Sequence, residues 1–278
     1  MPMELRPLEV GELLDRTFSL YRKHFLVFVG IAAIPELVLL LTQLAMIAVL
    51  FGAGSQGSPD AMARLSVFVV LSSGVVALLT YSVAQGATVA AVADLYLERP
   101  AGIGKAYADI KGRWLPLLVA MTLVSVVSGF GLVFCIVPGV LLMVAWSVTF
   151  PAVVVERMRP VEAMQRSWRL TAGSRPRIFL ATLVVVALSY VINAICQLPG
   201  IAMAGVSGLM NSASIPVMAL VALQVGNAVS ACATLPLISI LLSLVYYDQR
   251  VRKEGFDLQL MLSSLEPREG DPRPRAFS

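Results

Sequence analysis

The stretch FLVFVGIAAIPELVLLLTQLAMIAVLFG, residues 25–52, decides the fold of this chain because it is apolar almost throughout. It contains no Lys or Arg, and its single charged residue is Glu36. A helix needs about 20 mostly apolar residues to cross the hydrocarbon core of a membrane, since each residue adds about 1.5 Å. The stretch therefore predicts a transmembrane helix.

Five further apolar runs without an internal Lys or Arg follow along the chain, at residues 65–95, 114–135, 138–155, 178–204 and 214–247. Of the 278 residues, 58% are hydrophobic and 14% are charged, whereas a soluble domain carries about 25% charged residues. Backbone groups in lipid must be paired internally, and continuous apolar runs exclude the alternating pattern of barrel strands. We therefore expect an all-α membrane protein with six transmembrane helices, and not a soluble enzyme.

The apolar residues 114–155 permit two interpretations. A tight turn at Val137–Gly139 would divide them into two spans. A single re-entrant hairpin is the alternative.

Basic residues indicate the orientation of the helices in the membrane. Of the 21 Lys and Arg residues, 20 lie in the N-terminal segment, in alternate connections or in the C-terminal tail, and only Arg64 lies in a connection of the other set. Cytoplasmic segments carry an excess of Lys and Arg. We therefore predict a multi-pass protein of the bacterial inner membrane with cytoplasmic N- and C-termini and no cleaved signal peptide.

A threefold repeat is predicted within one membrane domain, residues 1–265. Its units cover about 8–98, 99–157 and 158–250, and each has an amphipathic helix followed by two spans. In every amphipathic helix an apolar residue stands four positions before an aromatic one: Leu14/Phe18, Ile103/Tyr107 and Met164/Trp168. Residues 266–278 lack apolar periodicity and predict a disordered cytoplasmic tail.

The amphipathic helices have two possible roles. They could lie in the membrane surface, where basic residues face anionic lipid headgroups, or they could pack beneath the bundle as a cap. The predicted contacts to headgroups or to a protein partner are Arg16, Arg22, Lys23, Arg166, Arg169, Arg250, Arg252 and Lys253. A homo-oligomer is a further possible partner, and the modest net charge of +4 gives no reason to expect nucleic acid.

Glu36 is the candidate functional group inside the membrane, because a carboxylate there is costly. It could handle a proton, a cation or a substrate amine. The alternative is a protonated side chain bonded to a carbonyl that Pro35 leaves free. Polar residues of the spans could line a path or serve as hydrogen-bonding contacts between helices: Gln43, Gln85, Asn193, Gln197, Gln224 and Asn227.

Several small residues and carboxylates are predicted to have structural roles, in helix packing and in ion pairs. Ser82, Gly86 and Ala90, and likewise Gly226 and Ser230, recur at helical spacing and permit close helix approach. Acidic residues that stand beside Arg or Lys predict ion pairs at the membrane boundary: Glu12, Asp15, Asp94, Glu98, Glu156 and Asp248.

Catalytic and metal-binding motifs are missing from the sequence. There is no G-x-S-x-G, P-loop or H-E-x-x-H motif, and His24 is the single histidine. Cys135, Cys196 and Cys232 stand in apolar stretches and read as small buried hydrophobes. We expect no catalytic residue, metal site or cofactor.

Three segments carry a family resemblance: RPLEVGELLDRTFSLYRKHF at Arg6–Phe25, PAVVVERMRPVEAMQRSWRLTAG at Pro151–Gly173 and YYDQRVRKEGFDLQLM at Tyr246–Met261. They resemble the integral membrane domain associated with bacterial glycerophosphoryl diester phosphodiesterases. In full-length members a soluble phosphodiesterase barrel follows, whereas here about 30 residues follow the last span, far fewer than the roughly 250 of such a barrel. The resemblance therefore implies a stand-alone membrane domain without the phosphodiesterase activity.

The function expected from the sequence is non-enzymatic: the protein would organise lipid or a partner at the cytoplasmic leaflet. A small transporter or channel that uses Glu36 is the alternative. An enzyme acting on lipid comes third, because it would need a partner to supply the chemistry.

Overall fold

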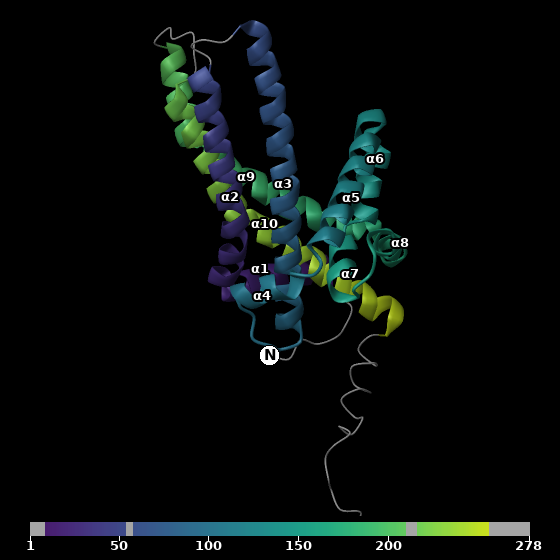
Figure 1. Ribbon diagram of the computed structural model, residues 1–278. Coiled ribbons are helices and arrows are strands. Elements are labelled where there is room, and N and C mark those ends of the chain that lie inside the picture. The colour runs from purple at the N-terminus through teal and green to yellow at the C-terminus, as the bar shows by residue number, and fades with distance from the viewer. Residues whose placement is uncertain (1–8, 54–57, 210–215, 256–278) are drawn as a thin grey trace, which may run out of the picture.

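The computed structural model describes residues 9–53, 58–209 and 216–255, and the regular elements in these ranges are helices (Figure 1). In chain order they are α1 (Val10–Lys23), α2 (Phe25–Ala53), α3 (Pro59–Tyr96), α4 (Ile103–Ile110), α5 (Trp114–Phe134), α6 (Ile136–Ala145), α7 (Thr149–Val155), α8 (Pro160–Thr171), α9 (Arg175–Leu209) and α10 (Val217–Glu254). The predicted tail, residues 266–278, lies outside the described residues.

Six segments of the described chain are long and apolar enough to cross a membrane, which confirms the predicted fold class. They are Phe25–Gly52, Asp60–Tyr96, Trp114–Phe134, Ile136–Val155, Arg175–Val206 and Val217–Glu254. Large apolar side chains stand open on the outer helices: Leu26 of α2 is 80% exposed and Phe68 of α3 is 65% exposed. Hydrocarbon is the solvent that suits such a surface. The chain is a multi-pass α-helical membrane protein.

The α3 and α10 helices extend well beyond one predicted end each. The α3 helix begins at Pro59, where the Ser58 hydroxyl accepts a hydrogen bond from the Ala61 amide at 3.4 Å and the proline occupies the first helical position. The α10 helix continues to Glu254 and ends at Gly255, whose φ of +58° glycine adopts readily.

The turn between the third and fourth spans lies at Cys135, not at the predicted Val137–Gly139. Pro138 stands in the first turn of α6, where an amide N–H has no helical acceptor, so the helix tolerates it. Gly139 packs against α5, since a Cβ atom there would lie 2.5 Å from the Leu132 backbone nitrogen. The segments on either side, 21 and 20 residues long, each suffice for a span.

The fourth span is broken, which the sequence did not predict. The α6 helix ends at Ala145 and α7 begins at Thr149, with a turn at Trp146–Val148 between them. The Thr149 amide bonds to the Trp146 carbonyl, three residues back, so the Ala145 carbonyl loses its usual helical donor.

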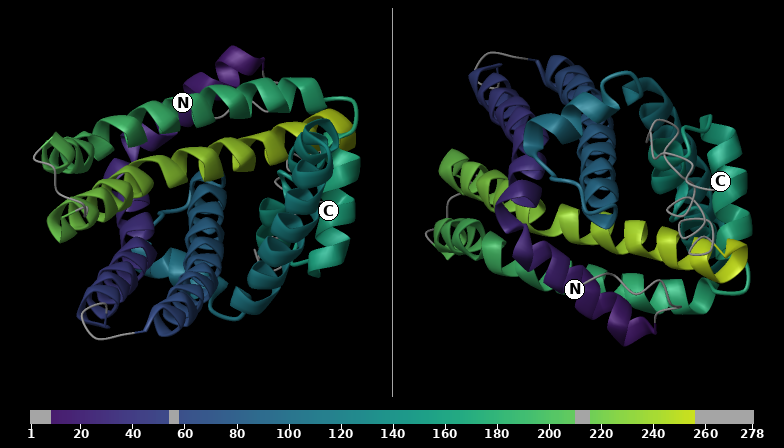
Figure 2. Two further views of the ribbon diagram at one scale, coloured as in Figure 1. Left: turned by 90° about the horizontal axis from the view of Figure 1, so that it is seen from above. Right: turned by 90° about the horizontal axis from the view of Figure 1, so that it is seen from below.

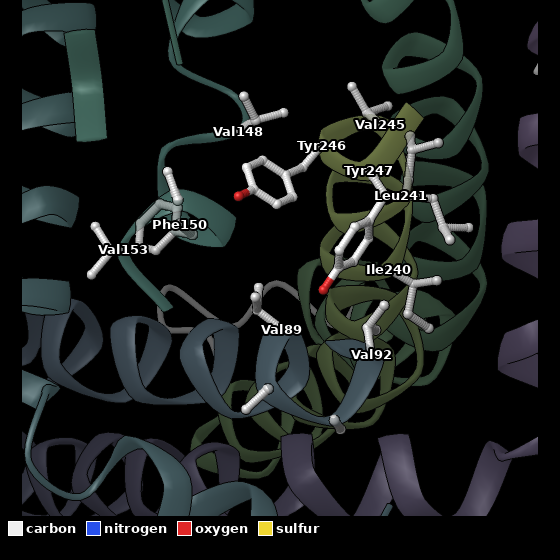
Figure 3. Packing of buried hydrophobic residues seen from close by; sticks show 14 of the residues in the cluster. Val89, Val92, Val148, Phe150, Val153, Ile240, Leu241, Val245, Tyr246 and Tyr247 are labelled. Atoms are coloured by element: carbon white, nitrogen blue, oxygen red, sulfur yellow. The ribbon is translucent and has the colours of Figure 1, made fainter. Parts of the chain in front are cut away.

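The α10 helix is the centre of the molecule. It lies between α9 on one side and the hairpins α2–α3 and α5–α6 on the other (Figure 2). Figure 3 shows the core where α3, α7 and α10 meet, with Val92, Val148 and Tyr246 completely buried.

The surface helices α1, α4 and α8 lie toward one end of the bundle, and α3 begins at the opposite end (Figure 1). We call the end that carries α1, α4, α8 and the C-terminal turns of α10 the basic face. Each surface helix is followed by two spans, so the order of elements agrees with the proposed repeat units. The relation among the three units stays a prediction.

Candidate functional site on the basic face

The surface helix α4 is hydrogen-bonded to the span α2, which contains Pro35. The Tyr107 hydroxyl donates to the Ile31 carbonyl at 2.6 Å. Because Pro35 has no amide N–H, it leaves this carbonyl without its helical donor. The alternative raised for Glu36 assigned such a carbonyl to the glutamate, whereas in the structure Tyr107 bonds to it. Burial raises the pKa of Tyr107 to about 12.

The other two surface helices make comparable bonds. The Tyr21 hydroxyl of α1 donates at 2.8 Å to the Ala233 carbonyl, in the turn that precedes Pro236 of α10. The Ser167 and Thr171 hydroxyls of α8 donate to the Ala145 carbonyl at 2.8 and 3.1 Å, where the fourth span breaks. Each surface helix thus bonds to a span of another predicted repeat unit, which joins the three units to one another.

The first ion cluster joins α7, α8 and α10. Arg166 of α8 bonds to Glu254 at the end of α10, through its Nη1 atom and also through Nη2 at 2.7 Å to Oε2. Its Nη2 atom also donates to Glu156 at 3.0 Å. Tyr246 donates to Glu156 at 2.5 Å, and the Arg250 Nε atom lies 3.7 Å from Glu156. The hydrogen bond that Arg166 donates to Glu254, followed by those that it donates to Glu156, raises the pKa of Arg166 above its usual value despite partial burial.

The second ion cluster surrounds Asp248, which is buried. Arg177 at the start of α9 lies 2.9 Å from it, and Arg252, one helical turn further along α10, lies 3.1 Å from it. A separate pair, Lys105 and Asp94, holds α4 to the end of α3 at 2.8 Å. The predicted ion pairing is therefore confirmed for Asp94, Glu156 and Asp248.

Five of the eight predicted headgroup contacts are engaged inside the protein. Arg166, Arg250 and Arg252 belong to the ion clusters, and the Lys253 ammonium donates to the carbonyls of Arg169 and Ala172, which caps the end of α8. Arg16 is half-buried and also interacts within the fold. Helical periodicity could not reveal this, because it ignores which distant helix lies alongside.

The remaining three contacts, Arg22, Lys23 and Arg169, are exposed. In or just after each surface helix, an exposed aromatic ring stands close in sequence to an exposed cation. Phe25 follows Lys23, Trp114 follows Lys111 and Trp168 precedes Arg169; their exposed fractions are 45%, 50% and 43%. Basic side chains and open aromatic rings therefore share the basic face.

Glu36 points into the bundle and is 3% exposed, although its neighbours Leu37 and Val38 are open to the outside. Its side chain lies on the side of α2 that faces Tyr81 of α3 and Cys232 of α10. Of the polar residues that could have lined a path, Asn193 and Asn227 bond to each other at 3.3 Å between α9 and α10. That pair is a contact between helices.

Comparison of the chain with family models, with curated proteins and with solved structures finds no match. The resemblance to the phosphodiesterase-associated membrane domain therefore stays a prediction. Part of its C-terminal segment, together with residues 1–8, lies outside the described residues.

The described residues contain no group of three His, Cys, Asp or Glu side chains placed to hold a metal ion. The cysteines are free, and the expectation that they are buried was wrong: Cys135 is exposed at the α5–α6 turn, and Cys196 and Cys232 are only partly buried. Sequence reasoning missed the tyrosine bonds to the spans. The available signal was the presence of prolines in the spans together with tyrosines in the surface helices.

Proposed function

We propose that this chain is a non-enzymatic protein of the bacterial inner membrane, with cytoplasmic termini, that binds anionic lipids at the cytoplasmic leaflet. The observation that carries the proposal is the pairing of exposed aromatic rings with exposed cations on the basic face. Aromatic rings are favourable at headgroup depth, and each basic residue near an anionic leaflet contributes about 1 kcal/mol. The excess of basic residues on one side supports the orientation.

The internal bonds of α1, α4 and α8 support a rigid platform for such contacts. Each surface helix is hydrogen-bonded to a span near a proline or at the break in the fourth span. These bonds would hold its cations at a fixed depth relative to the spans. The resemblance to a phosphodiesterase-associated membrane domain, whose activity is not expected here, is compatible with a role in lipid binding or in holding a partner.

Retention of lipid during purification tests the proposal. We expect Arg22→Gln/Lys23→Gln to lower co-purified phosphatidylglycerol, relative to phosphatidylethanolamine, by about thirtyfold, because two contacts of about 1 kcal/mol are lost. The matched control is Arg64→Gln, an exposed cation at the opposite end of the bundle. Equal phosphatidylglycerol in the double variant and the wild type would count against lipid binding by the exposed cations of α1.

A second candidate function is transport of a proton, a cation or an amine through the bundle. It is favoured by the burial of Glu36 among α2, α3 and α10 rather than toward lipid. Flux into proteoliposomes that is lost in Glu36→Gln would support it. Absence of flux for the wild type, with tested protons, alkali cations and amines, would exclude it for those substrates.

A further inference from the structure

A groove of about 540 Å³ lies on the basic face beside α8. It is lined by Trp146, Val161, Met164, Gln165, Trp168 and Arg169. Its volume falls within the range of roughly 300–1,000 Å³ that is typical of small-molecule sites. Most of the lining is apolar, and Val161 is 56% exposed, so the groove is open to an occupant.

Two tryptophans line the groove, one from a membrane span and one from a surface helix. Trp146 belongs to the turn that breaks the fourth span, and Trp168 belongs to α8; their ring centroids are 6.5 Å apart. The groove therefore lies where the membrane-crossing part of the bundle meets its surface helix. An occupant there would have one part in hydrocarbon and one part at the headgroups.

Two cations stand at the groove. Arg169 lines it, and the guanidinium of Arg175, the first residue of α9, lies 4.1 Å from the centre of the Trp168 ring. The Arg175 Nε–H is buried and has no hydrogen-bond acceptor among the described residues. The Arg175 side chain as a whole is half-buried and its guanidinium stands over Trp168, so its charge adds to that of Arg169 beside the groove.

The charges around the groove favour an anion. Lys253 bonds to carbonyls at the end of α8 and adds positive charge at that end. The acidic residue nearest in sequence, Glu162, accepts a bond from the Arg159 amide at 3.4 Å and is thus engaged at the start of the helix. An apolar groove that has at one end cations without an ion pair among the described residues suits an anionic amphiphile.

We infer that this groove binds one anionic phospholipid taken from the bilayer. An acyl chain packs against Trp146, Val161 and Met164, and a phosphate oxygen accepts a hydrogen bond from the Arg175 guanidinium while Arg169 adds attraction. The inference rests on the proposed function and deepens it, because it assigns one defined site to a lipid that would otherwise be bound diffusely. A second groove, beside α4 and Trp114, has similar walls, but no unpaired donor marks it.

Tryptophan quenching by brominated lipid tests the inference. In a Trp114→Phe background, Trp146 and Trp168 are the remaining tryptophans, and both line the groove. Bilayers of phosphatidylcholine would be doped with phosphatidylglycerol that has brominated acyl chains. We expect half-maximal quenching at a much lower mole fraction than with brominated phosphatidylcholine.

Two variants address the two halves of the site. Arg175→Gln should raise the half-quenching mole fraction of phosphatidylglycerol about tenfold, as expected for the loss of one charged hydrogen bond. Val161→Glu places a negative charge in the groove at an exposed position and should act similarly without altering Arg175. The matched control, Arg159→Gln, removes an exposed cation of the same region that does not line the groove.

The inference is overturned if brominated phosphatidylcholine quenches equally well, or if both groove variants quench as the wild type does. The two proposals fail separately. If Arg22→Gln/Lys23→Gln loses phosphatidylglycerol while the groove variants change nothing, surface binding stands and the groove site falls. If the groove is selective while the α1 variant keeps its lipid, the groove site stands and α1 is not a lipid contact.

Discussion

Arg166 shows how one side chain can hold the basic face together. Its guanidinium bonds to carboxylates that precede α8 and that end α10, and its side chain is only 18% exposed. An arginine fork suits two carboxylates because several donors lie in one plane. Charge reversal at this residue, which the sequence would have suggested as a lipid-binding test, would instead place a third acid beside Glu156 and Glu254.

Replacing Arg166 by alanine is expected to lower the free energy of unfolding by roughly 2–4 kcal/mol, because two partly buried carboxylates each lose one of their partners. Thermal unfolding in detergent measures the change. Arg169→Ala, three residues along the same helix and exposed, should stay within about 0.5 kcal/mol of the wild type.

The double variant Arg166→Ala/Glu254→Gln provides the decisive comparison. It should be more stable than Arg166→Ala alone, because Arg250, which lies beside both Glu156 and Glu254, then has one carboxylate to neutralise instead of two. A double variant less stable than the single one would show that the cluster is not held by charge pairing.

Close approach of backbones joins α9 to α10. A Cβ atom at Gly226 would collide with the carbonyl oxygen of Cys196, so the small residue predicted for packing does permit the two helices to touch. Backbone atoms cannot move aside as the end of a side chain can.

Gly226→Ala is expected to destabilise the protein by about 1–3 kcal/mol through overpacking, although alanine is the better helix former. Gly205→Ala, also in this hairpin, has nothing within 4 Å of the new Cβ atom and should be neutral or slightly stabilising. Melting temperatures of the two variants in detergent test the contrast, and equal melting temperatures would disprove the close contact.

The surface helices should make stability depend on alkaline pH. Burial raises the pKa of Tyr21 and of Tyr107 to about 12 in the folded protein, from an ordinary 10. A raised pKa means that the folded state keeps these protons longer than the unfolded state does. Their contribution is fully present below pH 10 and is lost as the pH rises from about 10 to 12.

Unfolding measured from pH 9 to 12 should therefore show a decline that is shallower in Tyr21→Phe/Tyr107→Phe. At neutral pH this variant should be less stable, by about 0.5–1.5 kcal/mol for each lost bond. Tyr190→Phe, at an exposed position of α9, serves as the control. An identical pH dependence in the double variant and the wild type would contradict the assignment.

On the side opposite the basic face, the helical hairpins end at different distances from that face. The α5–α6 tip lies nearer the basic face than the α2–α3 tip does (Figure 1). The residues of the α5–α6 tip are apolar and exposed; Val133 and Phe134 are each more than 80% exposed. At the turn, the Cys135 amide bonds to the Gly131 carbonyl and its own carbonyl accepts from the Gly139 amide, so the backbone tolerates a low-polarity environment.

We expect Cys135 to resist a charged, membrane-impermeant maleimide in intact cells or vesicles, because lipid surrounds the tip. In a background where Cys196 and Cys232 are replaced by Ala, Arg64→Cys should react from one side of the membrane and Arg169→Cys from the other. Rapid labelling of Cys135 would place the tip in water. Labelling of positions 64 and 169 from one side would overturn the proposed orientation.

Sequence alone determined the six spans, the surface helices and the acidic residues at the ends of the spans, because hydropathy and helical period are local properties of a chain in lipid. Tertiary structure alone decided that Arg166 bonds to Glu254, 88 residues away, and that Tyr107 bonds to the carbonyl freed by Pro35. It also decided the break at Trp146–Val148 and the groove beside it. These features depend on which distant helices lie alongside one another, and neither composition nor periodicity encodes that arrangement.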